Sequence, residues 1–352
     1  MTNVVLLRPD ERQDPAIQTA RLIQAFAVGR RAQGDVFWLK ENAEFLGALA
    51  STGATLDSAA LQPLAGFHRG CRDLLRDFPQ YYRFILSICL DLEDLGLPRH
   101  HGAGLCAKVA RAGLEGAELS DLQRAETRRL LRRRGVGPQV NDGALGQRLR
   151  DFIARSATFA MPNRKAAYEL THIVFYLSDY GRRCPDLPEA ALKSLHFTGL
   201  LAFLDQDMDL LAEVCAALRF AGQAPSPLWE DAIAASHRAM RVYADEGAPL
   251  RDDYHQWLVT GWAMRIAGRP LRSTPIPKGA LRFRTSNKAV GALRPLATCL
   301  SDMGANRRAD WEQMRPHVLS YLCPESHATL LRAERAGPYF EEFFEGFARA
   351  RA

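Results

Sequence analysis

An all-α fold of repeated helix pairs, each of about 42 residues, is predicted for this chain, and such pairs build either a closed α/α toroid or an open α-solenoid. Two observations predict this class. Nearly every segment carries apolar residues at positions i, i+3, i+4 and i+7, whereas alternating β-branched runs are almost absent. In addition, seven amphipathic segments end in a glycine, namely Gly53, Gly96, Gly135, Gly181, Gly222, Gly268 and Gly304.

These glycines predict where helices end, because glycine readily adopts the left-handed conformation that closes a helix. Successive glycines lie roughly 36 to 46 residues apart, which is the length of two helices and two turns. A second helix therefore fits between most successive ends. We expect these second helices at residues 57–76, 99–112, 143–159, 187–203, 227–244 and 308–322. Helix starts agree with this division, since Ser120 and Gln123 form a capping box and Pro227 follows Ser226.

The helix ends run through nearly all of the 352 residues and leave no linker, so a single domain over residues 1–352 is expected. The clearest extended segment lies at residues 269–284. It contains two X-Pro dipeptides and a long gap before the next helix, and we expect it to pass over one face of the domain as a lid loop.

The net charge of +6 arises from 46 basic and 40 acidic residues, and all but six of the basic residues are arginine. Such an arginine bias is typical of GC-rich coding sequences, so we do not expect a nucleic-acid partner. The densest cluster is open to two interpretations, a solvated helix end or a phosphate-binding patch. It consists of Arg128, Arg129, Arg132, Arg133 and Arg134.

Cysteine usage and hydropathy predict a reduced, cytoplasmic protein. The seven cysteines include no Cys-x-x-Cys pair, and most lie within apolar helical segments. The first residues do not resemble a signal peptide, and no apolar stretch approaches the roughly 20 residues of a membrane-spanning helix. No membrane partner is expected.

Polar residues recur at fixed distances before the glycines. Arg83, Tyr168, Asp209 and His255 occupy one column, and Ser87, His172, Glu213 and Val259 occupy a second column four residues later. A spacing of four places both columns on one face of their helices. Ionisable side chains are rarely buried without partners, so this face predicts a polar interior rather than an ordinary core.

The candidate site residues come from this face. His172, Asp209, Glu213 and His255 are the expected ligands of a divalent metal, because imidazoles and carboxylates suit such ions. The candidate catalytic residues are Tyr168, His172, Asp179 and His255, in which an imidazole acts as base or ligand and Asp179 orients it. No His-x-x-x-His motif occurs, so the site depends on the tertiary arrangement. The alternative is that His172 is a core histidine hydrogen-bonded to a neighbour such as Asp179.

The helix from Tyr168 to Gly181 resembles a Thr-His-x-x-Phe-Tyr…Asp-x-Gly signature of uncharacterised bacterial all-helical proteins, and the likeness extends over residues 165–268. Such proteins are similar in layout to the α/α toroids of the terpenoid cyclase and protein prenyltransferase superfamily. The chain lacks the sequence motifs that carry out the chemistry of that superfamily. It has only Asp205-Gln206-Asp207-Met208 in place of Asp-x-Asp-Asp, and no Asp…Cys…His zinc set. The resemblance therefore implies an architecture and no particular reaction.

Two hypotheses for the function follow. The first is a metal-assisted enzyme that acts on a small molecule or a peptide in a central polar funnel. The alternative is a non-catalytic helical-repeat scaffold that binds a protein or a nucleic acid along its concave face. They predict different surfaces: an enzyme should enclose a cavity into which His172 and His255 both point, whereas a scaffold should show an open groove with His172 packed away.

Overall fold

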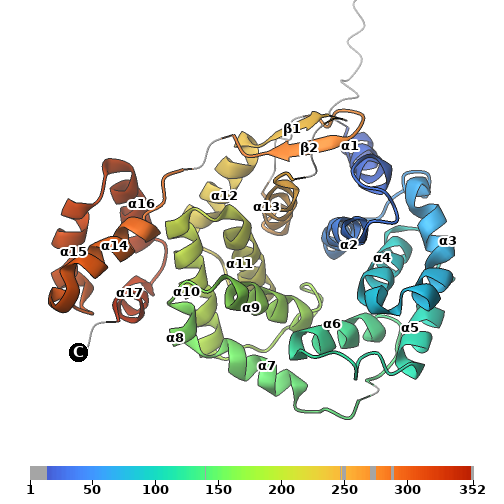
Figure 1. Cartoon of the computed structure of the whole chain (residues 1–352), viewed down its shortest axis with the longest axis horizontal. Coiled ribbons are helices and arrows are strands. Elements are labelled where there is room, and N and C mark those ends of the chain that lie inside the picture. The colour runs from blue at the N-terminus through green and yellow to red at the C-terminus, as the bar shows by residue number, and fades with distance from the viewer. Residues whose placement is uncertain are drawn as a thin grey trace, which may run out of the picture.

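The computed structural model describes residues 14–138, 140–245, 247, 251–269, 275–286 and 289–349, and these residues fold mostly into helices (Figure 1). Six helices lie around a common centre. They contact one another in chain order, and the last of them also contacts the first. These six are α2 (Val36–Ser51), α4 (Tyr82–Leu95), α6 (Asp121–Arg132), α9 (Arg164–Leu177), α11 (Met208–Phe220) and α13 (Tyr254–Ile266).

The predicted glycines close these helices. The first six glycines follow the C-terminal ends of the six central helices, and the seventh, Gly304, follows α14 (Leu293–Met303). All seven have positive φ values, the region in which a side chain is strained. At Gly96 the requirement is also steric, because a Cβ atom there would lie 2.6 Å from the carbonyl oxygen of Leu56. The helix ends are thus confirmed as predicted.

A second set of helices packs outside the central six (Figure 1). The predicted second helix at 143–159 is divided in two, because Arg155 leaves the helical conformation with a ψ of 65°. Side-chain caps set several helix starts: Ser120 accepts a hydrogen bond from the Gln123 amide, and Asp207 accepts one from the Leu210 amide. The outer helices are α1 (Pro15–Gln24), α3 (Gln62–Asp77), α5 (Gly102–Arg111), α7 (Leu145–Ile153), α8 (Ser156–Phe159), α10 (Glu189–Asp205) and α12 (Pro227–Ala239).

One short antiparallel sheet departs from the all-α expectation. The strand β1 (Arg241–Ala244) pairs with β2 (Leu281–Arg284), and Val242 lies opposite Phe283. The predicted helix at 227–244 therefore ends early, and the predicted lid at 269–284 ends in a strand whose Phe283 is 1% exposed. Residues 270–274 of that segment lie outside the described residues. Four-residue strands are too short to show the alternation that identifies a strand in a sequence.

The C-terminal helices lie to one side of the central six and pack on α10 (Figure 1). Their aromatic residues Trp311, Phe340 and Phe344 belong to the same hydrophobic cluster as the second half of the central helices. None of the helices in the described residues is long and apolar enough to cross a membrane. Besides α14, the C-terminal helices are α15 (Trp311–Tyr321), α16 (Pro324–Glu334) and α17 (Phe340–Ala348).

Candidate functional site

A cavity of about 260 Å³ lies between the six central helices. Each of these helices contributes at least one ionisable side chain to its wall. Phe175, Tyr176 and Trp262 supply an aromatic part of the same wall. The cavity is therefore a mixed polar and aromatic chamber, the usual composition of a small-molecule site. Its ionisable lining residues, one from each helix in chain order, include Glu44, Arg83, Glu126, His172, Glu213 and His255.

The structure brings most of the two polar columns to this cavity. Both histidines, Glu213 and Arg83 line it, together with Ser87 and Val259. Tyr168 and Asp209 do not line this cavity, but both contact its histidines through hydrogen bonds. A spacing of four residues places both columns on one face of their helices, and members of both columns line the same cavity.

His255 on α13 forms a dyad with Asp209 on α11. Its Nδ1 atom lies 2.8 Å from Oδ1 of Asp209, and the hydroxyl of Tyr168 donates to the other carboxylate oxygen at 3.0 Å. Burial disfavours the charged imidazole, but the hydrogen bond and the negative charge of Asp209 outweigh it and raise the pKa of His255 to about 9. His255 is therefore an imidazolium at neutral pH, and the pKa of Asp209 is correspondingly lowered despite burial.

His172 on α9 is held differently. Its Nδ1 atom lies 2.8 Å from the backbone oxygen of Tyr168. A carbonyl oxygen only accepts hydrogen bonds, so Nδ1 donates to it, and in the tautomer that this contact selects the lone pair belongs to Nε2. The neighbour that holds the ring is thus the backbone of Tyr168, and no hydrogen bond among the described residues joins His172 to Asp179. The side chain is 34% exposed, so the ring is accessible from the cavity.

Glu213 lies beside His172 and is almost completely buried. Its Oε2 atom accepts a hydrogen bond from the Thr171 hydroxyl at 2.6 Å and lies 3.8 Å from Nδ1 of His172. Burial raises the pKa of Glu213, because the charged carboxylate loses more hydration free energy than its attraction to the nearby histidines supplies. A raised carboxyl pKa beside a cavity is a common property of catalytic acids and bases.

Asp179 lies apart from the other predicted site residues. It follows the end of α9, and its carboxylate pairs with Arg129 at 3.3 Å and with Arg182 at 3.6 Å. The Arg129 guanidinium lies over the ring of Tyr180, 4.8 Å from its centroid, and lines the cavity. Asp179 thus fixes the orientation of a cavity arginine and contacts neither histidine through a described hydrogen bond.

The arginine cluster at the C-terminal end of α6 is mostly paired inside the protein. Arg133 binds Asp91 at 2.7 Å, and Arg134 binds Glu93 at 2.8 Å. Arg128 and Arg129 bind Glu115 and Asp179. The interpretation of these four as a solvated helix end is wrong, because acidic side chains of neighbouring segments lie directly opposite them. The same pairing leaves little free charge for a phosphate patch.

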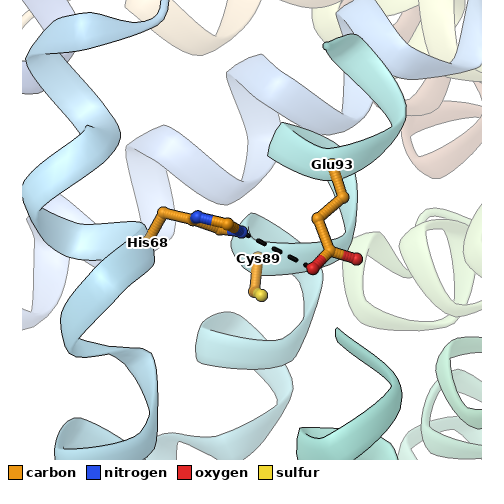
Figure 2. A group of neighbouring side chains, drawn as sticks. All are labelled: His68, Cys89 and Glu93. Carbon is orange, nitrogen blue, oxygen red and sulfur yellow. Dashed lines mark ion pairs between the residues drawn. The ribbon is translucent and has the colours of Figure 1, made fainter. Parts of the chain in front are cut away.

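A second histidine group lies on the other side of α4. His68 on α3 reaches across to Cys89 and Glu93 on α4 (Figure 2). Among the residues that the structure describes, these three form the one group of His, Cys, Asp or Glu whose ligand atoms all lie within 4.8 Å of one another. The four predicted ligands His172, Asp209, Glu213 and His255 do not form such a group. Sequence reasoning missed the second group, although the spacing of four between Cys89 and Glu93 places them on one helical face.

Comparison with known proteins identifies a family without a known activity. Residues 1–350 match the family model described as "Domain of unknown function (DUF6902)". No curated protein and no solved structure matches the chain.

Proposed function

We propose that this chain, which belongs to the DUF6902 family, is an enzyme that performs general acid–base catalysis on a small molecule in its central cavity. One observation carries the proposal: His172 and His255 line the same cavity, and each is held by a different kind of partner. Enzymes commonly contain two titratable groups whose environments favour opposite protonation states.

The two histidines have separate roles in this proposal. His255, kept protonated by Asp209, is the general acid, and its Nε2 atom donates the proton. His172 is the general base, because its Nε2 lone pair is available while Nδ1 is bound to the Tyr168 carbonyl. Tyr168 positions Asp209, and Asp179 positions Arg129. Glu213 supplies a second proton-exchanging group beside His172.

The cavity size and lining restrict the substrate class. A volume of about 260 Å³ accommodates a small molecule or the end of a peptide, but not a folded partner. The aromatic wall suits an apolar or planar portion of the substrate, and the neighbouring arginines and carboxylates suit a polar group on it. Such a substrate carries at least one exchangeable proton within reach of both imidazoles.

The same contacts support the inference of an α/α toroid. The six central helices contact one another in chain order, α13 contacts α2, and outer helices pack between them. This enclosed arrangement favours the enzyme over the scaffold, because the scaffold hypothesis needs an open groove with His172 packed away. The metal-assisted form of the hypothesis would require the four predicted ligands to move closer together.

A ligand screen followed by mutagenesis tests the proposal. A metabolite library is screened by thermal shift on the wild-type protein, and the compounds that raise Tm are incubated and analysed for turnover by mass spectrometry. We expect a compound whose turnover falls roughly 100-fold or more in His172→Gln and in His255→Asn. His317→Gln, a change at an exposed histidine of α15, is the matched control and should retain full turnover.

Two results would count against the proposal. Unchanged turnover in both cavity variants would exclude the histidines from the chemistry. Turnover that depends on added Zn²⁺, and that disappears together with bound metal in His172→Ala, would instead support the metal-assisted form. A retained far-ultraviolet circular dichroism spectrum is required of each variant before it is interpreted.

A further inference from the structure

The group of His68, Cys89 and Glu93 is buried, and one ring nitrogen of His68 lacks a hydrogen bond. The three residues are 4%, 0% and 4% exposed. Nε2 of His68 lies 3.5 Å from Oε1 of Glu93, but it makes no hydrogen bond of normal geometry. A buried ring nitrogen without a hydrogen bond costs free energy, so its position requires an explanation.

A fourth potential donor lies beside the group. The ring of His101 packs edge-on against the ring of His68, with centroids 4.8 Å apart. Its Nδ1 atom is also buried without a hydrogen-bond partner. The backbone amide of His101 donates to Oε1 of Glu93, which ties the start of α5 to the same carboxylate. Two imidazoles, one thiol and one carboxylate thus meet at the junction of α3, α4 and α5.

We propose that His68, Cys89 and Glu93 bind a Zn²⁺ ion, and that the ring of His101, which packs against that of His68, turns to take the fourth position. The donor types are those that Zn²⁺ prefers, and a set of four protein ligands is typical of a structural zinc site. On binding, the Cys89 thiol and the protonated His68 imidazole each release one proton to solvent, as the sulfur–zinc and nitrogen–zinc bonds form. No electron is transferred in this step.

The position of the site suggests its role. Cys89 and Glu93 lie on the outer side of α4, whereas Ser87 and Asp91 of the same helix line the central cavity. A bound ion would hold α3 and α4 and the start of α5 in fixed relative positions. It would therefore stabilise one wall of the cavity from outside without contacting a substrate.

Metal content and cobalt spectroscopy on the full-length protein test the proposal. Protein produced with added Zn²⁺ is expected to retain about one zinc per chain after desalting, measured by plasma mass spectrometry. Replacement by Co²⁺ is expected to produce a thiolate-to-cobalt charge-transfer band. Both signals should disappear in Cys89→Ser, and His68→Gln should weaken binding at least roughly 10-fold. His101→Ala should weaken binding while keeping the band.

Matched cysteine variants separate this site from other thiols. Cys71→Ser changes a neighbouring buried thiol, whose Sγ donates to the Phe67 carbonyl, and Cys215→Ser changes a distant buried thiol; both should keep the band. The double variant Cys184→Ser/Cys323→Ser removes the two exposed thiols and should also keep it. Absence of zinc and of the band in the wild type would overturn the proposal. A band that survives Cys89→Ser and is lost in the double variant would overturn it as well.

Discussion

Two buried glutamates of this protein each lie close to a histidine, but their pKa values are shifted in opposite directions. The Glu93 side chain is 1% exposed and lies 3.5 Å from a histidine, and the Glu213 side chain is 3% exposed and lies 3.8 Å from another. Burial opposes ionisation of both. The pKa of Glu93 is nevertheless lowered well below its ordinary value, whereas the pKa of Glu213 is raised.

The difference lies in the hydrogen-bond donors around each carboxylate. Glu93 accepts from two backbone amides at the start of α5 and from Arg134, in addition to its pairing with His68. Glu213 accepts from the Thr171 hydroxyl and receives only distant support from the two cavity histidines. A carboxylate with many hydrogen-bond donors stays ionised and holds helices together, whereas one with few donors has a raised pKa.

The largest expected effect is on stability. Glu93→Ala should lower the free energy of unfolding by about 3 to 5 kcal/mol, because it leaves Arg134 and two helix-start amides with fewer partners. Glu213→Gln should change it by less than about 1 kcal/mol, since glutamine still accepts from Thr171. Urea denaturation of metal-free protein measures both. Equal losses would mean that the two glutamates do not differ as described.

The second prediction concerns the protonation of His255. Asp209→Asn removes the charge that raises the pKa of His255 to about 9, so this pKa should fall to its ordinary 6.5 or below, where burial places it. Nuclear magnetic resonance titration of the imidazole protons measures the change. In the wild type the pair should contribute stability that is complete below pH 6.5 and is lost as the pH rises through about 9. A variant with an unchanged titration would contradict the dyad.

A smaller effect is expected in the pH dependence of stability. The pKa of Glu213 is higher in the folded protein than its ordinary 4.5, so the unfolded chain loses this proton first. The contribution of Glu213 to stability should therefore decrease as the pH rises above 4.5. Glu213→Gln should remove this decrease and flatten the curve of thermal midpoint against pH. Identical curves would show that Glu213 is ionised in the folded protein.

The smallest effect is expected at the exposed member of the arginine cluster. Arg132→Ala should leave the thermal midpoint within experimental error, because Arg132 is exposed. Arg134→Ala, two residues further along the chain, should lower the midpoint by several degrees since it removes the cation that pairs with Glu93. Differential scanning calorimetry compares the two. A similar response at both positions would argue against a structural role for the Glu93 pair.

Much of the helical framework could be predicted from local patterns. The seven glycines end helices, and most members of the polar columns counted back from four of them line one cavity. The repeat of about 42 residues, its closure into a toroid, the single domain and the cytoplasmic location stay predictions. The short sheet could not be predicted, because Val242 and Phe283 pair across about 40 residues of chain and each strand is too short for a periodic signal.

Helix ends and helix faces are local properties, set by glycine conformation and by a period of 3.6 residues, so they can be found without knowledge of the fold. Ion-pair partners are not local. Arg134 lies beside Glu93, and Thr171 beside Glu213, only because separate helices pack side by side. Whether the pKa of a buried carboxylate is lowered or raised depends on those partners, and it was therefore decided by the packing of the helices.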